Sequence, residues 1–209
     1  LTHEIMNSIT PVASLAQTAV DLVDDAARKL EGHPLVLEEL ADVKSAVETV
    51  ARRSDGLMHF VQSYRRLTRL PAPQKKTIRL AGLFASLEKL QAAQWAQKSI
   101  ALTLQVEPIT LEVNADPDML EQVLLNLLQN AEQVLRGREG ARVSVLANLS
   151  RQGNVSIEIA DNGPGVPAEL AKQIFVPFFT TKREGSGVGL ALTRQVMLVH
   201  GGTATLGVS

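Results

Sequence analysis

Apolar residues recur at alternating steps of four and three from residue 5 to residue 30. This spacing is the heptad pattern of a helix that supercoils around a partner helix. The tetrapeptide Glu31-Gly32-His33-Pro34 follows, and a glycine cap with a proline stop behind it predicts that the helix ends there. The apolar positions of this first segment are Ile5, Ile9, Val12, Ala16, Ala19, Val23, Ala26 and Leu30.

A second apolar seam with the same alternation follows Pro34, and its last members are polar or mixed. Two long helices joined by a short turn form an antiparallel hairpin. Further apolar residues, such as Leu15 and Leu22, widen the stripes beyond what one hairpin can cover. We therefore predict a homodimer through the hairpin, as a four-helix bundle; a monomeric hairpin folded against the rest of the chain is the alternative. The second seam comprises Val36, Leu40, Val43, Val47, Val50, Ser54, Leu57, Val61, Tyr64 and Thr68.

Three polar residues lie together on the outer face of the first predicted helix. His3 is one position past a core site, Glu4 is its neighbour, and Asn7 lies one turn further along that face. A carboxylate beside an imidazole can hold the proton of one ring nitrogen and raise the nucleophilicity of the other. This group is therefore a candidate for chemistry.

Pro11 lies in an early turn of the same predicted helix. Proline lacks a backbone N–H, so the carbonyl of Asn7 loses its helical partner and we expect a bend there. A bend that switches the helix between two poses and a purely structural kink both fit this position. The remaining histidines, which we expect to be ordinary solvated residues, are His33, His59 and His200.

The period of the apolar pattern changes after residues 70–76, a proline-containing stretch that reads as a linker. Beyond it, strand-like and helical segments alternate, which predicts an α+β domain with helices on one face of a mostly antiparallel sheet. A last strand is expected to begin at Thr203–Val208. The predicted strands are Ile100–Val106, Arg142–Leu149 and Val155–Ala160, and the predicted helices are Leu80–Ala96, Met119–Leu135 and Val188–His200.

Composition narrows the classes of function. Of the 209 residues, 45% are hydrophobic and 21% charged, the formal net charge is −1, and cysteine is absent. This balance is typical of a folded protein and gives no sign of attraction to nucleic acid, so we expect no nucleic-acid partner. Without cysteine there are no disulfides or thiolate metal sites, which fits a reducing cytoplasm. No apolar run approaches the ~20 residues of a membrane span, so we expect any membrane anchor to lie in segments outside this chain.

Two glycine-rich turns and a pair of asparagines carry the candidate chemistry of the second half. Residues 161–165 (DNGPG) follow a predicted strand, and residues 185–189 (GSGVG) lead into a predicted helix whose first backbone N–H groups suit phosphate. Asn126 and Asn130 project from one face of an otherwise aliphatic helix, and amide oxygens are ligands suited to Mg²⁺. Ordinary explanations for the three elements are an Asx turn, a glycine helix cap and two solvated asparagines.

In this order, the elements resemble a bacterial sensor histidine kinase over essentially the whole chain. HEIMN (3–7) resembles the H box, NLLQNA (126–131) the N box, DNGPG (161–165) the first glycine box, FVPFFTTK (175–182) the F box and GSGVGLAL (185–192) the second glycine box. The resemblance implies a dimerisation and histidine-phosphotransfer hairpin over 1–69, a linker over 70–76 and an ATP-binding domain over 77–209.

The implied fold is an α-helical hairpin, forming a dimeric four-helix bundle, followed by an α+β two-layer sandwich. The sandwich is of the GHKL type shared by histidine kinases, gyrase and Hsp90, and we expect its C-terminal strand to be missing. The implied cytoplasmic core belongs to a full-length protein that is membrane-anchored in many members of the family.

The resemblance also implies an activity and its partners. The family autophosphorylates a histidine from ATP and passes the phosphoryl group to an aspartate of a response regulator receiver domain. By this correspondence His3 is the phosphoacceptor and Glu4 polarises it. Asn7 lies where family members place a group that positions water for dephosphorylation of the regulator, so response-regulator phosphatase activity is also expected.

The implied cofactors are ATP and Mg²⁺. Asn130 is expected to hold Mg²⁺, with Asn126 nearby, and the Asp161 carboxylate is expected to accept a hydrogen bond from the adenine amino group. Gly163 and Gly165 let the backbone approach the ring. The residues implied around the phosphates are Thr181 and Lys182, which belong to a lid segment (residues 175–185), and Gly185, Gly187 and Gly189, which precede or begin the next helix.

Two alternatives have different functions. One is an ATP-hydrolysing machine of the gyrase or Hsp90 type, in which a glutamate one turn before the metal-binding asparagine activates water. Asn126 stands at that position, so the general base is missing. The other is a nucleotide-binding dimeric scaffold without kinase activity, against which the intact Asn130, Asp161 and both glycine boxes count.

Overall fold

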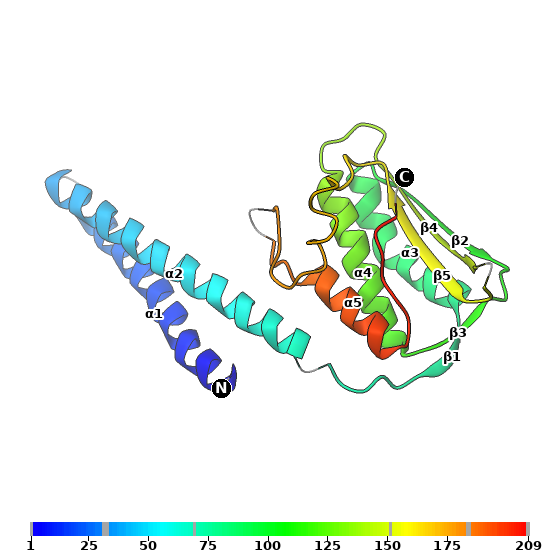
Figure 1. The fold of residues 1–209 in the computed structure, drawn as a ribbon. Coiled ribbons are helices and arrows are strands. Elements are labelled where there is room, and N and C mark those ends of the chain that lie inside the picture. The colour runs from blue at the N-terminus through cyan, green and yellow to red at the C-terminus, as the bar shows by residue number, and fades with distance from the viewer. Residues whose placement is uncertain (1, 31–33, 69, 151, 183–184, 208–209) are drawn as a thin grey trace. The chain divides into compact units, whose positions relative to one another are not determined.

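The computed structural model describes residues 2–30, 34–68, 70–150, 152–182 and 185–207, and leaves the side chains of residues 2–4, 34, 59, 63 and 66 undescribed. The chain divides into two compact units, Leu1–Arg69 and Leu70–Ser209 (Figure 1). Each unit has its own architecture and its own buried residues.

The first unit is a hairpin of two helices, α1 (Thr2–Lys29) and α2 (Pro34–Thr68) (Figure 1). Pro34 suits the first position of α2 because its fixed φ matches a helix and its missing N–H would have no partner there. The turn predicted at Glu31–His33 lies outside the described residues. The helix α1 continues through Pro11, and the predicted bend stays a prediction.

Small and β-branched side chains bring the two helices together. Ala16, Val20, Ser54 and Val61 are buried, although Val20 lies outside the predicted seam. Asp24 and Lys44 form a salt bridge of 2.6 Å between their side chains, partly exposed across the hairpin. The predicted two-helix hairpin is confirmed.

Much of the apolar surface of the hairpin remains uncovered. Leu15 and Leu22, seven positions apart on α1, are 69% and 64% exposed, and on α2 Val43 and Leu57 are 49% and 51% exposed. Leu15 and Leu22, seven residues apart, lie on one side of α1 and form an exposed stripe there, and Val43 and Leu57 are exposed heptad positions of α2.

The second unit contains two small sheets. β1 (Lys76–Arg79) pairs antiparallel with β3 (Glu112–Ala115). β4 (Arg142–Leu149) is the middle strand of the other sheet, parallel to β2 (Ala101–Glu107) and antiparallel to β5 (Val155–Asp161). Two of the three strand pairings are thus antiparallel.

Three helices lie on one face of the three-stranded sheet: α3 (Leu80–Gln97), α4 (Pro117–Val134) and α5 (Gly189–Val199) (Figure 1). The sheet meets them through the alternate residues of its middle strand, as expected for a sheet with one buried face. The buried residues of that strand are Val143, Val145 and Ala147.

The fold class is confirmed, with two omissions and one error in the predicted elements. The three predicted helices and three predicted strands are present, and their ends shift by at most two residues. The short strands β1 and β3 were not predicted, and Lys76 of the predicted linker belongs to β1. Residues 203–207 form no strand, so a last strand does not begin at Thr203 as expected, and Val208 of the predicted range lies outside the described residues. No described helix combines the length and the apolar character needed to cross a membrane.

A buried carboxylate ties α4 to α3. Glu132 is 6% exposed, and its oxygens accept hydrogen bonds from Trp95 Nε1 at 3.1 Å and Lys98 Nζ at 2.5 Å. Gln94 Nε2 donates a third, at 3.4 Å. The charge is therefore compensated and fully hydrogen-bonded, which a buried carboxylate requires.

We predict that Glu132→Ala lowers the free energy of unfolding of the second unit by about 2–3 kcal/mol, because it leaves the Trp95 and Lys98 donors unpaired. Urea unfolding followed by fluorescence measures this directly, since Trp95 is the single tryptophan of the chain. Glu132→Gln keeps an acceptor for the indole and is expected to cost less. Equal stability of the wild type and Glu132→Ala would contradict the role of the carboxylate.

Candidate functional site

The helix α4 is positioned at its start by an acidic cap. Asp116 Oδ1 accepts hydrogen bonds from the backbone N–H groups of Asp118 and Met119, at 3.1 and 3.2 Å, and Pro117 occupies the first turn. A carboxylate in this position satisfies amide groups that have no partner within the helix and interacts favourably with its dipole.

The same carboxylate fixes the chain that enters the second unit. Asp116 Oδ2 accepts a hydrogen bond from the backbone N–H of Gln74 at 2.7 Å. This bond, followed by those from Met119 and Asp118, holds the pKa of the Asp116 carboxyl below its ordinary value of 3.8.

His200 completes this arrangement, and the expectation that it is an ordinary solvated residue is wrong. Its Nε2 accepts a hydrogen bond from the backbone N–H of Asp116 at 3.0 Å, and its Nδ1 lies 2.8 Å from the carbonyl oxygen of Val196. Because an N–H can only donate, Nε2 carries no proton in this arrangement and Nδ1 is the donor. Lys75 Nζ donates to the carbonyl of His200 at 3.1 Å.

Asn126 joins α4 to the beginning of α5. Its Nδ2 donates a hydrogen bond of 3.1 Å to the hydroxyl of Thr193, which is only 3% exposed. Its amide also lies against Gly189, where a Cβ would come within 2.8 Å of Nδ2 and closer still to Oδ1. Of the two asparagines on this face, Asn126 thus faces α5, and only glycine fits at residue 189 without a shift.

One turn later on α4, two carboxamides hold a lysine of the lid segment. Lys182 Nζ donates hydrogen bonds to Asn130 Oδ1 at 3.2 Å and to Gln133 Oε1 at 2.6 Å. Burial lowers the pKa of the Lys182 ammonium, and the nearby charge of Arg136 lowers it further. The amide oxygen of Asn130 therefore faces a cation.

The base of the lid segment is closed by backbone contacts. Phe178, at φ 66°, donates its N–H to the carbonyl of Gly187 at 2.8 Å. Gly187 has φ 64°, and a Cβ there would lie 2.4 Å from the Phe178 carbonyl carbon, so this crossing excludes larger residues. Within the segment, the hydroxyl of Thr180 accepts a hydrogen bond from the N–H of Lys182 at 3.1 Å.

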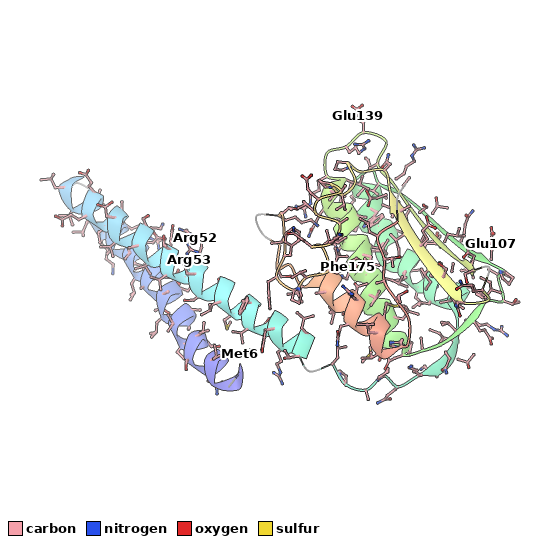
Figure 2. All side chains as sticks on the ribbon, in the orientation of Figure 1. Met6, Arg52, Arg53, Glu107, Glu139 and Phe175 are labelled. Atoms are coloured by element: carbon pink, nitrogen blue, oxygen red, sulfur yellow. The ribbon has the colours of Figure 1, made fainter. Side chains whose placement is uncertain are left out.

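The start of the lid segment lies against α5. The guanidinium of Arg194 is 6.0 Å from the centroid of the Phe175 ring, a cation–π contact at the edge of its useful range. Figure 2 shows Phe175 beside α5. Thr181 is exposed, and a Cβ on Gly185 would collide with the Thr180 side chain.

The first glycine box lies at the other end of α4. Asp161, exposed at the end of β5, accepts a hydrogen bond from the N–H of Gly163 at 2.8 Å. A Cβ on Gly163 would lie 2.5 Å from Asp161 Oδ1 and 3.2 Å from Val134 Cγ2 of α4, so glycine is needed for this approach. Gly165 has φ 73° with open space around it.

Sequence reasoning missed the role of the asparagine inside this box. Asn162 Oδ1 accepts a hydrogen bond from the N–H of Arg142 at 2.8 Å, and its Nδ2 donates to the carbonyl of Gly140 at 2.9 Å. The amide thus fixes the turn to the start of β4. The Asx-turn tendency of this sequence was visible, but its partner across the sheet was not.

The helix α4 brings the predicted residues of the second unit together along one side. Asn126 contacts Gly189, Asn130 contacts Lys182, and Val134 packs beside Gly163. The start of α5, a lysine and an amide oxygen form a surface that can bind an anion together with a hard cation. The described residues contain no cluster of three or more histidine, cysteine or acidic side chains suited to a metal.

The candidates of the first unit lie on α1. His3 and Glu4 are within the helix, but their side chains lie outside what the structure describes. Asn7 is exposed. A shallow cavity of about 330 Å³ lies beside the acidic cap of α4, and none of the predicted site residues lines it.

Comparison with known proteins agrees with the motifs. Residues 115–209 match the family of histidine kinase-, DNA gyrase B- and HSP90-like ATPases. The sensor histidine kinase ZraS of Klebsiella oxytoca is 32% identical over 201 residues, which is 96% of this chain and 40% of ZraS. The chain thus spans two fifths of that relative's length.

Solved structures show the same fold. Full-length ShkA in complex with AMPPNP is similar with a TM-score of 0.61 and 26% identity, over 93% of this chain and 41% of ShkA. The histidine kinase ThkA in complex with the response regulator TrrA has a TM-score of 0.59 over 94% of this chain and 55% of that chain; at 21% identity it supports the fold alone. The predicted resemblance is confirmed.

We predict that the second unit loses stability as the pH falls below about 4, in part through Asp116. A carboxylate with a lowered pKa in the folded state contributes fully above its unfolded pKa, and this contribution is lost as the pH falls through the folded pKa. The Asp116→Asn variant should therefore have a lower free energy of unfolding than the wild type at pH 7. Its free energy of unfolding should also fall less than that of the wild type between pH 5 and pH 2. Unfolding followed by Trp95 fluorescence at each pH measures this. Asp118→Asn, at the exposed neighbouring acid, is the matched control, and equal pH slopes in both variants would contradict the role of Asp116.

Proposed function

Because the chain belongs to the sensor histidine kinases, we propose that it is the catalytic core of such a kinase and transfers the γ-phosphoryl group of ATP to His3. The observation that carries this proposal is that Lys182 and the start of α5 both lie against α4, at Asn130 and Asn126. The chain is also similar to a sensor histidine kinase over 96% of its length.

The second unit is proposed to bind ATP along α4. The first backbone N–H groups of α5 and the ammonium of Lys182 suit the phosphates, since both carry positive charge beside Asn130. At the other end of the helix, Asp161 is proposed to accept a hydrogen bond from the adenine amino group. Its fixed position supports this, because Gly163 already orients the carboxylate.

Asn130 is proposed to hold Mg²⁺ against the phosphates. The fit rests on its amide oxygen, a hard ligand that accepts a hydrogen bond of 3.2 Å from Lys182 Nζ in this structure and would exchange that donor for the metal when the nucleotide binds. When bound, the metal would neutralise charge on the transferring phosphoryl group. Asn126 is proposed to act on the site indirectly, by holding α5 against α4 through Thr193.

The proposed reaction is an in-line displacement at the γ-phosphorus. A nitrogen of the His3 imidazole forms the N–P bond while the bond to the bridging oxygen breaks and ADP leaves, and Glu4 stabilises the positive charge that develops on the ring. Lys182 neutralises charge on the phosphates. Catalysis of this kind depends on positioning and charge rather than on covalent work by the protein.

The phosphoryl group is then proposed to pass to an aspartate of a response regulator receiver domain. The crystallised ThkA complex contains a response regulator, which makes this class of partner reasonable for a chain of the same fold. Dephosphorylation of the regulator with the help of Asn7 is a further proposal, supported by the exposure of that residue one turn after His3. A cytoplasmic location and the lack of a nucleic-acid partner stay predictions.

The hairpin is proposed to form a homodimer. The exposed stripe that contains Leu15 and Leu22 lies beside the heptad seam of α1 and widens it, and a second hairpin would cover it. An ATP-hydrolysing machine is the less favoured function, because Asn126, bonded to Thr193, stands where a water-activating glutamate is needed.

Incubation with ATP labelled at the γ-phosphate tests the proposed reaction. We predict acid-labile, base-stable label on the wild type, its loss in His3→Ala, and its loss in Asp161→Ala because nucleotide no longer binds. His59→Ala is the matched control, since it removes another helical histidine. Label that survives His3→Ala would refute the assignment. Equal nucleotide binding by the wild type and Asp161→Ala would contradict the role of Asp161, and a wild type that binds nucleotide but takes up no label would favour the scaffold.

Substitution of the exposed stripe tests the dimer. We predict that Leu22→Glu shifts the protein from dimer to monomer in sedimentation equilibrium, because it places a charge in a buried interface. Leu90→Glu, at a leucine of α3 that is 59% exposed, should leave the dimer intact. A wild type that sediments as a monomer at micromolar concentration would overturn the proposal.

A further inference from the structure

Gln133 makes the shorter of the two hydrogen bonds that hold the lid lysine. Its Oε1 accepts from Lys182 Nζ at 2.6 Å, compared with 3.2 Å for Asn130 Oδ1. Asn130 and Gln133 are three residues apart on α4, so their side chains are neighbours on the helix surface. The sequence motifs assigned no role to Gln133.

The backbone around Lys182 is already fixed by the lid segment itself. The N–H of Lys182 donates to Thr180 Oγ1 at 3.1 Å, its carbonyl accepts from Gly185 at 3.3 Å, and the pair formed by Phe178 and Gly187 closes the base. The long side chain of Lys182 reaches from this base to α4. Its ammonium has three donors, two of which are used by the carboxamides.

The ammonium of Lys182 needs the two amide oxygens as hydrogen-bond acceptors, because burial and a nearby positive charge both disfavour an ammonium without partners. The side chain is half-buried, and Arg136, one turn beyond Gln133, repels it. Neutral amide oxygens can hold the ammonium beside Asn130 without cancelling its charge, which a carboxylate at position 133 would do. The positive charge thus remains available to an anion.

We propose that Gln133 is a positioning residue of the nucleotide site, which holds Lys182 beside Asn130 before the nucleotide binds. The inference rests on the proposed function, since it assigns the third donor of the ammonium to a phosphate oxygen. A flexible lysine that is ordered in advance loses less conformational entropy on binding, so the affinity for nucleotide rises. Gln133 itself contacts no phosphate in this arrangement.

Limited proteolysis without nucleotide tests the contact alone. Trypsin must take the Lys182 side chain into its own pocket to cleave after this residue, so release from α4 should speed cleavage. We expect Gln133→Leu to be cut after Lys182 at least about threefold faster than the wild type, with the products identified by mass. Gln129→Leu, the same change at an exposed glutamine of α4, should be cut at the wild-type rate. Equal rates for Gln133→Leu and Gln129→Leu would overturn the inference.

A double-mutant cycle tests whether Gln133 acts through the lysine. The probe is ADP with Mg²⁺, measured by titration calorimetry. We expect Gln133→Leu and Lys182→Met each to weaken binding about five- to tenfold, the double variant to bind no more weakly than Lys182→Met, and Gln129→Leu to bind as the wild type does. Additive losses, or tighter binding by Gln133→Leu, would overturn the positioning role.

The two arms separate this inference from the proposed function. If the wild type binds the nucleotide and the cycle shows no coupling, the inference fails while the proposed function stands. If the wild type binds no nucleotide, both fail, and faster cleavage of Gln133→Leu would then report a structural contact only.

Discussion

The contact between the Asn126 amide and the first residue of α5 sets the geometry on which the second unit depends. The two helices approach so closely there that a single Cβ on Gly189 would collide with the amide, and the buried hydroxyl of Thr193 fixes the orientation of that amide. The start of α5 is thereby held at a defined height along α4, one turn from Asn130. The proposed phosphate-binding start of α5 and the proposed metal-binding oxygen of Asn130 can serve one ligand only if this spacing is kept.

The helix α4 carries structural side chains and the side chains of the proposed nucleotide site on different sides. Glu132 faces α3, where it binds Trp95 and Lys98, while its neighbour Gln133 holds the lid lysine. Adjacent residues of a helix point about 100° apart, so the two tasks do not compete for space. The anchored side limits the movement of the helix, and the adjacent side can then hold its polar groups in a constant arrangement.

The long apolar patterns were enough to predict the three helices and three strands of the second unit, but not that one of the two pairings in the three-stranded sheet is parallel. The short strands β1 and β3 were missed because four residues carry too little period-two pattern to distinguish a strand from a loop.

The partners of the polar side chains could not be predicted from the sequence. Spacing placed Asn126 and Asn130 on one face of α4, but the group that each one contacts depends on the positions of α5 and the lid segment. His200 was misjudged for the same reason, since its partner Asp116 is distant in the sequence. The close approaches that require glycine at residues 163, 187 and 189 are made to Asp161, Phe178 and Asn126, which the sequence did not predict. The predicted approach of these glycines to the nucleotide stays a prediction.

The predicted linker is shorter than its sequence suggests. Gln74 is hydrogen-bonded to Asp116, and Lys75 is hydrogen-bonded to His200. Since Lys76 already belongs to β1, the stretch left outside these anchors shrinks to residues 70–73, of which Pro71 and Pro73 have a fixed φ. Four extended residues reach at most about 14 Å. This connection is short and partly rigid, so it allows rotation about Gln74 more readily than a large translation. A rotation that begins at residue 70 would therefore reach the start of α4, through Asp116, and the end of α5, through His200, at the same time.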